Sequence, residues 1–199
     1  GEFYTPRPLT RLMVELVDPR LGETVLDPAC GTGGFLVAAI EHLRRHHRKT
    51  DADEQIIHAS VHGIEKKSLP YLLCVTNLML HGVDPAVSHG NALLLDDGSE
   101  PKWRFDVILA NPPWGGREHE SLLGHVAPEL HSLDTASLFL HRIMARLRPG
   151  GRAAVVVPEA MLFGGGAGTT LRQKLLEEHD LHTVVRLPKG AFSPYTSLK

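Results

Sequence analysis

The sequence predicts an α/β domain with a mainly parallel, twisted sheet and helices on both faces of that sheet. Short β-rich runs alternate with segments of helical periodicity, which is the pattern of βαβ units. The run at 105–109 is apolar apart from Asp106, as expected of a central parallel strand. The length of 199 residues suits one domain with a substantial core.

The first half of the chain is expected to alternate between helices and strands. Phe35, Leu36, Ala39 and Leu43 form an apolar stripe that predicts a helix. Gly82 is a typical helix stop. In order, we expect a helix at 9–17, a strand at 24–26, a helix from 34 to about 48, a polar connection at 50–55, a strand at 61–64, a helix at 69–81 and a strand at 87–89.

The second half of the chain continues the alternation around two polar loops. We expect a strand at 105–109, a helix at 134–148 closed by Pro149-Gly150-Gly151, a strand at 152–157, a helix at 170–179 and a strand at 183–187. The segments 100–104 and 115–133 are polar loops. The second follows Trp114 directly, so it is either a mobile substrate loop or a plain surface loop.

Composition and charge exclude several classes of protein. The net charge of −2 gives no global basic field, so any grip on nucleic acid must be local or come from another subunit. Hydrophobic residues make up 42% and charged residues 22%, which is ordinary for a soluble globular protein. No apolar run is long enough to span a bilayer and no signal peptide is visible, so we expect a cytoplasmic protein without a membrane partner.

Cysteines and histidines give no sign of a metal centre. Cys30 and Cys74 are the only cysteines and lack metal-ligand spacing, which predicts reduced thiols. Among thirteen histidines, the His46-His47 pair lies in a basic stretch that is typical of a solvated helix end. No carboxylate or cysteine ligand pattern accompanies the pair, so we expect no bound metal.

The run from Phe105 to Trp114 is the most informative feature of the chain. It is an apolar strand that ends in Asn111-Pro112-Pro113-Trp114, an amide followed by two stiff residues and an aromatic ring. This combination suits one task, which is to grip a flat ring that carries an amine and to present its nitrogen to an electrophile.

A glycine-rich loop between a strand and a helix, Cys30 to Gly34, provides a place for that electrophile. The dinucleotide fingerprint would begin at Gly31, but its sixth position is Leu36, and Glu65 is too distant to be its acidic residue. No Gly-Lys-Ser/Thr follows, so the loop is not a P-loop. A second glycine run, 164–168, also lacks that lysine and favours a flexible loop over a phosphate site.

Two carboxylates at strand tips define the expected ligand. Asp27 ends the first strand, where it repels phosphate and attracts an ammonium or sulfonium group. Glu65 ends the second strand, where its oxygens can accept from ribose hydroxyls. A ligand with a ribose, an amine and a carboxylate but no phosphate is S-adenosylmethionine. The alternative for Asp27 is a plain turn cap.

These motifs resemble a known family. Asp27-Pro-Ala-Cys-Gly-Thr-Gly-Gly-Phe35 together with Asn111-Pro-Pro-Trp114 is similar to the amino-group DNA methyltransferases, and more closely to the modification subunits of type I restriction-modification systems. Trp114 stands where that family more often has phenylalanine or tyrosine. Further matching landmarks are 2–6, 63–65, 77–82, 90–91, 147–152, Pro158 and 186–192.

The resemblance implies a Rossmann-like class I fold, S-adenosylmethionine as cofactor and adenine N6 in double-stranded DNA as the methylated group. It also implies a specificity subunit that reads the DNA and a restriction subunit. Family members carry a helical domain before 2–6 and continue past 193–197. We therefore expect residues 1–199 to be the methyltransferase catalytic domain, with those two parts absent.

Resemblance and chemistry together assign the cofactor-binding residues. Thr5 and the amides of 31–33 are expected to hold the methionine carboxylate, Asp27 the amine and Glu65 the ribose. Asn91 and Ala92 are expected to flank the adenine ring of the cofactor, with Tyr4 or Phe3 covering one face. The expected cofactor set is Phe3, Tyr4, Thr5, Asp27, Ala29, Gly31, Thr32, Gly33, Glu65, Asn91 and Ala92. Asp106 is expected to be structural.

For catalysis, the side-chain oxygen of Asn111 and the carbonyl of Pro112 are expected to accept from the target amine. Pro113 stiffens the corner, and Trp114 is expected to stack on an adenine rotated out of the duplex. The alternative for Trp114 is a core tryptophan. Two other functions share this chemistry or this fold: methylation of RNA or of a protein glutamine, and a non-catalytic assembly subunit.

Overall fold

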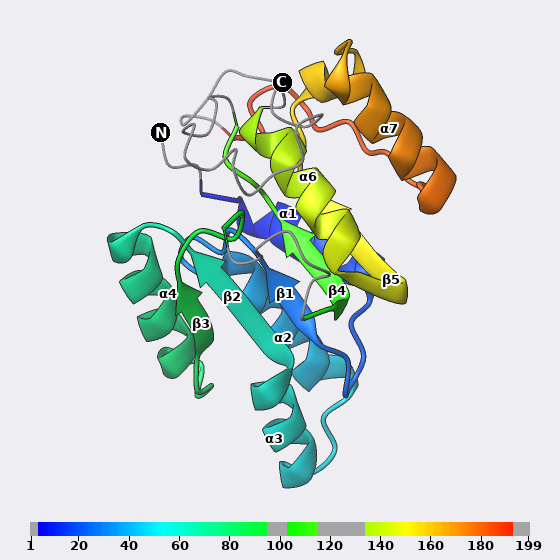
Figure 1. Cartoon of the computed structure of the whole chain (residues 1–199). Coiled ribbons are helices and arrows are strands. Elements are labelled where there is room, and N and C mark those ends of the chain that lie inside the picture. The colour runs from blue at the N-terminus through cyan, green and yellow to red at the C-terminus, as the bar shows by residue number, and fades with distance from the viewer. Residues whose placement is uncertain (1–3, 95–102, 115–133, 193–199) are drawn as a thin grey trace.

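Five parallel strands form one sheet in the computed structural model, which describes residues 4–94, 103–114 and 134–192. The strand order is β3-β2-β1-β4-β5, and every neighbouring pair is parallel (Figure 1). The chain therefore winds outward from β1 in both directions, which makes the carboxyl edge between β1 and β4 a topological switch point. The strands are β1 (Val25–Asp27), β2 (Val61–Glu65), β3 (Ala86–His89), β4 (Phe105–Ala110) and β5 (Leu147–Val155).

Helices cover both faces of the sheet, as the sequence predicted. In Figure 1, α6 crosses the near face of β4 and β5, whereas α1 and α2 lie behind the sheet. Alternate side chains of the central strands point into two separate apolar clusters: Val107 and Leu109 lie in one, and Ile108 lies in the other. The helices are α1 (Arg7–Val17), α2 (Gly34–His46), α3 (Asp51–Ser60), α4 (Ser68–Leu80), α6 (Thr135–Arg146), α7 (Ala167–Glu178) and the 3₁₀ turn η2 (Glu159–Leu162).

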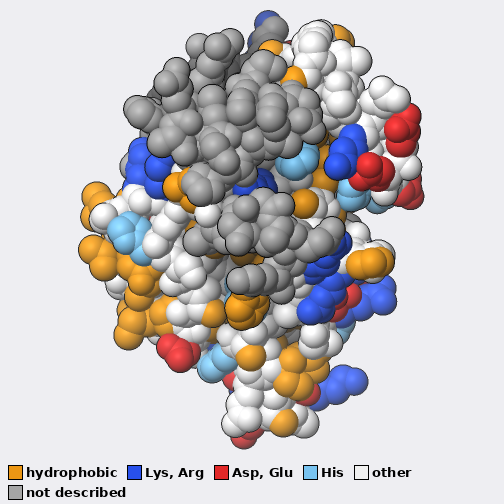
Figure 2. Space-filling view, in the orientation of Figure 1, with side chains coloured by type: hydrophobic (Ala, Val, Ile, Leu, Met, Phe, Trp, Pro, Cys, Tyr) orange, Lys and Arg blue, Asp and Glu red, His pale blue; other side chains and the backbone are white. Residues whose placement is uncertain are grey.

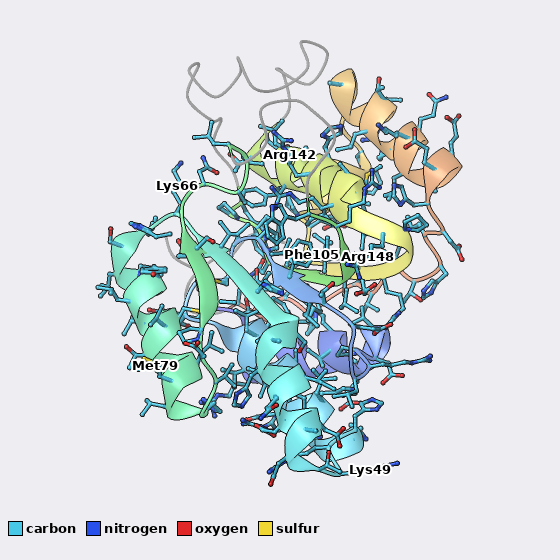
Figure 3. The ribbon with its side chains drawn as sticks, turned by 60° about the horizontal axis from the view of Figure 1, so that its bottom comes forward. Lys49, Lys66, Met79, Phe105, Arg142 and Arg148 are labelled. Atoms are coloured by element: carbon cyan, nitrogen blue, oxygen red, sulfur yellow. The ribbon has the colours of Figure 1, made fainter. Side chains whose placement is uncertain are left out.

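Helix α4 is apolar on both its inner and its outer side. Cys74 and Leu78 are buried toward the sheet. The outer side exposes Met79, which points away from the sheet in Figure 3, and the hydrophobic surface at the left of Figure 2 lies over this helix. The other exposed apolar side chains of α4 are Leu69, Leu72, Leu73 and Leu80.

Three predicted elements were wrong. The polar connection at 50–55 is the start of α3, because Thr50 and Asp53 form a reciprocal capping box that begins a helix at Asp51. The Pro149-Gly150-Gly151 turn does not close a helix, since α6 ends at Arg146 and these residues belong to β5. Pairing with β4 shifts register there, from Phe105↔Leu147 to Val107↔Arg152.

The third wrong element is the strand at 183–187. The segment is not a strand, and Val184 and Val185 are exposed. Its β-branched residues favour an extended conformation, but a strand also needs a partner for its ladder and a surface on which to bury a face. The expected loop at 115–133 and Phe3 lie outside the described residues. Within the described ranges, no helix has both the length and the hydropathy to cross a membrane.

Candidate functional site

The carboxyl edge of the sheet brings together residues from three strands. β1 ends at Asp27 and β2 at Glu65, and Asn111 directly follows β4. Because these strands are parallel neighbours, their tips meet at one edge. The glycine loop closes onto this edge: Gly31 N donates to Glu65 Oε2 at 2.9 Å, and Cys30 N donates to Ile64 O at 3.0 Å.

Asp27 is buried at this edge, with 1% of its surface exposed. Its Oδ1 accepts from Ala29 N at 3.1 Å. Loss of hydration raises the pKa of Asp27 to about 8. The hydrogen bond from Ala29 lowers this pKa, whereas the nearby charge of Glu65 raises it further. A cation placed beside the carboxylate would reverse this shift, so the site favours an ammonium or sulfonium ligand.

Glu65 is fixed by backbone donors on both of its oxygens. Oε2 accepts from Gly31 N, and Oε1 accepts from Lys67 N at 2.7 Å. A carboxylate has about four acceptor positions, so this arrangement orients the group and leaves capacity for two ligand hydroxyls. In this structure the amides of Gly31 and Gly33 have internal partners, Glu65 and Cys30 O respectively. Their expected contact with a methionine carboxylate stays a prediction.

The turn of the glycine loop demands glycine at position 33. Gly33 has φ of 84°, and a Cβ there would lie 2.8 Å from Cys74 Sγ. The same close approach places Cys30 Sγ 3.7 Å from Cys74 Sγ, and both are free thiols, as predicted. The contact with Cys74 and burial raise the pKa of the Cys30 thiol far above its usual range, which keeps it protonated and unreactive. Thr32 is tied to α4, because Asn77 Nδ2 donates to Thr32 O at 3.0 Å.

Asn111 is held in one orientation by Thr5. Its Nδ2 donates to Thr5 Oγ1 at 3.1 Å, across 106 positions of the sequence. Its Oδ1 is buried and finds no hydrogen-bond donor within the described residues. A buried acceptor without a donor carries a free-energy cost of about 1–3 kcal/mol. A ligand that donates a hydrogen bond to this oxygen would offset that cost.

Asn91 supplies the complementary group on the other side of β1. Its Oδ1 accepts from Leu93 N at 3.1 Å, whereas its Nδ2 is buried with no acceptor in the described ranges. Gly90 N donates to Glu65 O, which ties this segment to the tip of β2. Ala92 is buried in the same apolar cluster as Ile64, so it packs under the edge. Tyr4 is exposed.

The corner after Asn111 presents its aromatic residue against a second ring. Pro112 is buried and Pro113 is exposed. Trp114 is half-buried and meets Phe192 edge to face, with ring centroids 4.8 Å apart and an angle of 80° between the ring planes. Trp114 thus packs partly against the core, and its expected stacking on a rotated base stays a prediction. Sequence reasoning did not place Phe192 in contact with Trp114.

Comparison with known proteins gives one consistent result. Residues 1–199 match the family model of the N-6 DNA Methylase family. The type I restriction enzyme EcoEI methylase subunit from Escherichia coli is 47% identical over 201 residues, which cover 100% of this chain and 41% of that protein. A crystal structure of a modification subunit of a putative type I restriction enzyme from Vibrio vulnificus YJ016 matches with a TM-score of 0.93 at 51% identity, covering 100% of this chain and 43% of that one.

The chain belongs to the N-6 DNA methylase family. The resemblance read from its motifs is therefore confirmed. The chain spans about two fifths of the curated relative named above, from the 41% of that protein that it covers.

The fold class predicted for this chain is also confirmed. A putative class I S-adenosylmethionine-dependent methyltransferase from Listeria monocytogenes matches with a TM-score of 0.65 at 22% identity, covering 87% of this chain and 51% of that chain. At this identity the likeness concerns the fold alone. The parallel sheet and its switch point are thus those of class I methyltransferases.

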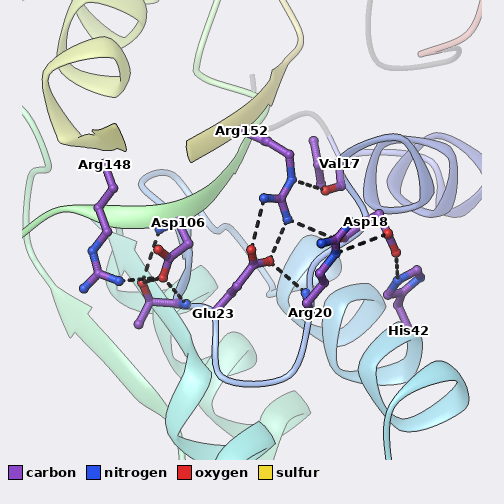
Figure 4. A network of polar contacts seen from close by, with 9 residues as sticks. Val17, Asp18, Arg20, Glu23, His42, Asp106, Arg148 and Arg152 are labelled. Carbon is purple, nitrogen blue, oxygen red and sulfur yellow. Dashed lines mark hydrogen bonds and ion pairs between the residues drawn. The ribbon is translucent and has the colours of Figure 1, made fainter. Parts of the chain in front are cut away.

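Asp106 lies away from the carboxyl edge of the sheet, and its contacts agree with the structural role expected of it. It lies at the amino end of β4, where Oδ2 accepts from Thr24 N at 2.8 Å, from Thr24 Oγ1 at 2.8 Å and from Arg148 Nη1 at 2.6 Å (Figure 4). Partial burial opposes ionisation, but the Arg148 guanidinium and the Thr24 donors keep the pKa of Asp106 below its usual value. In Figure 3, Arg148 lies close to Phe105 at this end of the sheet.

Proposed function

We propose that this chain transfers a methyl group from S-adenosylmethionine to the exocyclic N6 amine of an adenine rotated out of double-stranded DNA. The observation that carries the proposal is the buried, unsatisfied Oδ1 of Asn111, held in place by Thr5 beside a buried acidic edge. The family of the chain and its methylase-subunit relatives support the same reaction.

The residues at the edge fit the cofactor. When bound, S-adenosylmethionine supplies an electrophilic methyl group on a sulfonium sulfur. Asp27 would hold its ammonium group, because a cation offsets the desolvation of the buried carboxylate. Glu65 would accept from the ribose hydroxyls, and the buried Nδ2 of Asn91 would donate to a ring nitrogen of the adenine moiety.

On the target side, Asn111 would act on a weak nucleophile. The lone pair of an exocyclic adenine nitrogen is delocalised into the ring. Two acceptors, Asn111 Oδ1 and the carbonyl of Pro112, would accept hydrogen bonds from the two N–H groups of the amine and turn the nitrogen toward a tetrahedral geometry with a localised lone pair. The localised lone pair would accept the methyl group that S-adenosylmethionine supplies, and the nitrogen would then release one proton to solvent. Fixed dipoles stabilise the positive charge that develops on the nitrogen.

Trp114 would hold the rotated base. Its half-buried ring is steadied by the edge contact with Phe192, and stacking on a base contributes about 1–3 kcal/mol. The energy needed to unstack the base from the duplex is a few kcal/mol, so this contact offsets much of that cost.

Most of the contacts with DNA would be made by other subunits. The net charge is −2, and on the face shown in Figure 2 basic side chains lie in small groups beside acidic ones. Relatives are named as methylase subunits of type I restriction enzymes. This supports the proposal that the chain acts together with a specificity subunit and a restriction subunit. The specificity subunit would supply both the phosphate contacts and the base readout.

The deciding experiment separates methyl transfer from cofactor binding. Asn111→Ala should lower the rate of methyl transfer to an adenine-containing duplex by about 10²–10³-fold or more, because one of the two aligned acceptors is lost. Its affinity for S-adenosylmethionine, measured by calorimetry, should be unchanged. Transfer is followed as N6-methyladenine in digested duplex, with the specificity subunit present.

Three results would contradict the proposal. Equal loss of transfer and of cofactor affinity would mean that Asn111 has a structural role. Methyl transfer to RNA or to a glutamine peptide, with none to the duplex, would replace the substrate. A wild-type chain that does not bind S-adenosylmethionine would instead support a non-catalytic assembly subunit.

A further inference from the structure

The ends of α1 and α2 remote from Thr5 carry a second cluster of polar side chains. Glu15 on α1 and the C-cap residue Asp18 face His42 and His46 on α2, with His47 following. Helix α1 has 11 residues, so at 1.5 Å per residue this cluster lies about 16 Å along it from Thr5. The two helices pack against each other, and Figure 4 shows the contact of Asp18 with His42 that joins them.

His42 is the centre of the cluster, and only 4% of its side chain is exposed. Its Nε2 lies 3.0 Å from Asp18 Oδ1. A carboxylate only accepts, so Nε2 carries the proton in this contact, and the neutral ring then has its lone pair on Nδ1. That Nδ1 is buried, with no hydrogen-bond partner in the part of the chain that the structure describes.

Two further ligand-type groups lie near His42 Nδ1. Glu15 Oε1 lies 3.5 Å from His42 Nδ1, and His46 Nε2 lies 4.0 Å from the same Glu15 oxygen. One ligand atom from each of Glu15, His42 and His46 lies within 4.8 Å of the others. Zinc–ligand bonds of about 2.0–2.1 Å in a tetrahedron put ligand atoms roughly 3.3–3.5 Å apart, so the cluster needs only a small contraction.

We propose that Glu15, His42 and His46 bind a divalent d-block cation of the Zn²⁺ type at the α1–α2 contact. His42 and His46 are four positions apart, which places both rings on one face of α2, with centroids 4.6 Å apart. Asp18 holds the other nitrogen of His42, and such carboxylate–histidine pairs orient metal-ligating imidazoles. Two imidazoles and one carboxylate suit Zn²⁺, with water in the fourth position.

The charged neighbours of this cluster are few. Arg45 Nη1 lies 3.7 Å from Glu15 Oε1, and Arg20 Nε lies 3.9 Å from Asp18 Oδ2. Both arginines are exposed, so their pairs are weak and screened, and a cation would displace Arg45 from Glu15. His47 Nε2 is also buried without a partner among the described residues, and it faces the Asp18 side of His42.

The site follows a sequence pattern that can be checked. The sequence interpretation considered the adjacent pair His46-His47 and found no carboxylate nearby. The useful spacing is that between His42 and His46, and the carboxylates come from α1. The bound ion would join α1 to α2, and α1 directly follows the segment with Thr5, which orients Asn111.

The test is stoichiometric Zn²⁺ binding by the chelator-treated chain, measured by competition with a chromophoric chelator. The wild type should bind one equivalent. Glu15→Gln and His46→Gln change exposed positions, so they should fold normally and lose that equivalent. Asp18→Asn should weaken binding about 10–100-fold, since it removes only the orienting partner.

His58→Gln is the matched control. His58 Nε2 lies 3.0 Å from Glu54 Oε1 on α3, which is a histidine–carboxylate pair without a second imidazole in its cluster. This variant should keep the wild-type equivalent. Co²⁺ in the wild type should give the visible absorption of a tetrahedral site without a sulfur charge-transfer band. A wild type that binds no equivalent, or Glu15→Gln and His46→Gln variants with wild-type affinity, would overturn the proposal.

Discussion

The acidic residues at the two edges of the sheet have contrasting environments. At the amino edge, Asp106 accepts from Thr24 and Arg148, and Glu23 pairs with both terminal nitrogens of Arg152 (Figure 4). At the carboxyl edge, Asp27 is buried with one backbone donor and a like charge nearby. The first edge is arranged for stability, whereas the second holds groups whose partners a ligand would supply.

The pKa values of the two edges record this difference. Arg152 and the Arg20 amide keep the pKa of Glu23 below its usual value, although burial opposes them, and Arg148 and Thr24 have the same effect on Asp106. Burial raises the pKa of Asp27 to about 8. The carboxyl groups of Glu23 and Asp106 thus shift in the opposite direction from that of Asp27, because each of the two is paired with an arginine, whereas burial outweighs the one backbone donor of Asp27.

The largest expected effect is that of Asp27→Asn. The folded chain keeps the Asp27 proton up to about pH 8, whereas the unfolded chain releases it near 3.8. The folded state therefore binds more protons between these values, and the stability of the ligand-free chain should fall as pH rises from about 4 to 8. The change is at most on the order of 5 kcal/mol. Asparagine removes the ionisation, so the variant should be more stable than wild type at pH 8.

The same variant should bind S-adenosylmethionine poorly, because a neutral amide does not pair with an ammonium group. Urea unfolding at pH 5 and pH 8 and calorimetry with the cofactor measure the two effects. Equal pH dependence in wild type and variant would show that Asp27 is ionised in the free chain. Unchanged cofactor affinity would make Asp27 a turn cap.

A smaller effect of opposite kind is expected for Asp106→Ala at the amino edge. The variant loses contacts to Thr24 and to a charged Arg148, which should cost about 1.5–3 kcal/mol of unfolding free energy. Since the pKa of Asp106 is lowered, its contribution is present above about pH 4 and is lost as pH falls through the folded pKa. Methyl transfer at a temperature where the variant is folded should match wild type. A selective loss of transfer would place Asp106 in the functional machinery.

The smallest effect, and the sharpest test of the carboxyl edge, is Thr5→Val. The structure places Thr5 Oγ1 on Asn111 Nδ2, whereas the sequence predicted a contact with the methionine carboxylate. Loss of one neutral hydrogen bond, about 1 kcal/mol, should lower kcat roughly fivefold if Thr5 positions Asn111. The alternative is a weaker affinity for S-adenosylmethionine at unchanged kcat. Single-turnover kinetics and calorimetry on the same preparation distinguish the two roles.

Much of the fold could be predicted because its signals are local. The strand at 105–109 is apolar on both faces, and the stripe from Phe35 to Leu43 has the helical period, so both elements formed where expected. The errors arose where tertiary pairing decided the outcome. The turn at 149–151 belongs to a strand because β4 offers it a ladder, and the segment 183–187 forms no strand because no described strand pairs with it.

The candidate site could likewise be predicted from the sequence only in part. Asp27, Glu65 and Asn111 could be placed at one edge from sequence, because parallel strands end together. The contact of Thr5 with Asn111 spans 106 positions, and the edge contact of Phe192 with Trp114 also joins distant segments of the chain. Neither pair has a local signal, since each depends on how α1 and the segment before Phe192 pack.

The sequence alone determined which residues line the strand tips and what ligand chemistry they suit, because strand order and residue type follow from short-range patterns. Only the tertiary structure decided the ionisation of Asp27, the unsatisfied oxygen of Asn111 and the meeting of Glu15 with His42. Burial, hydration and contact between distant segments are properties of the packed chain, and these set the energies on which binding and catalysis depend.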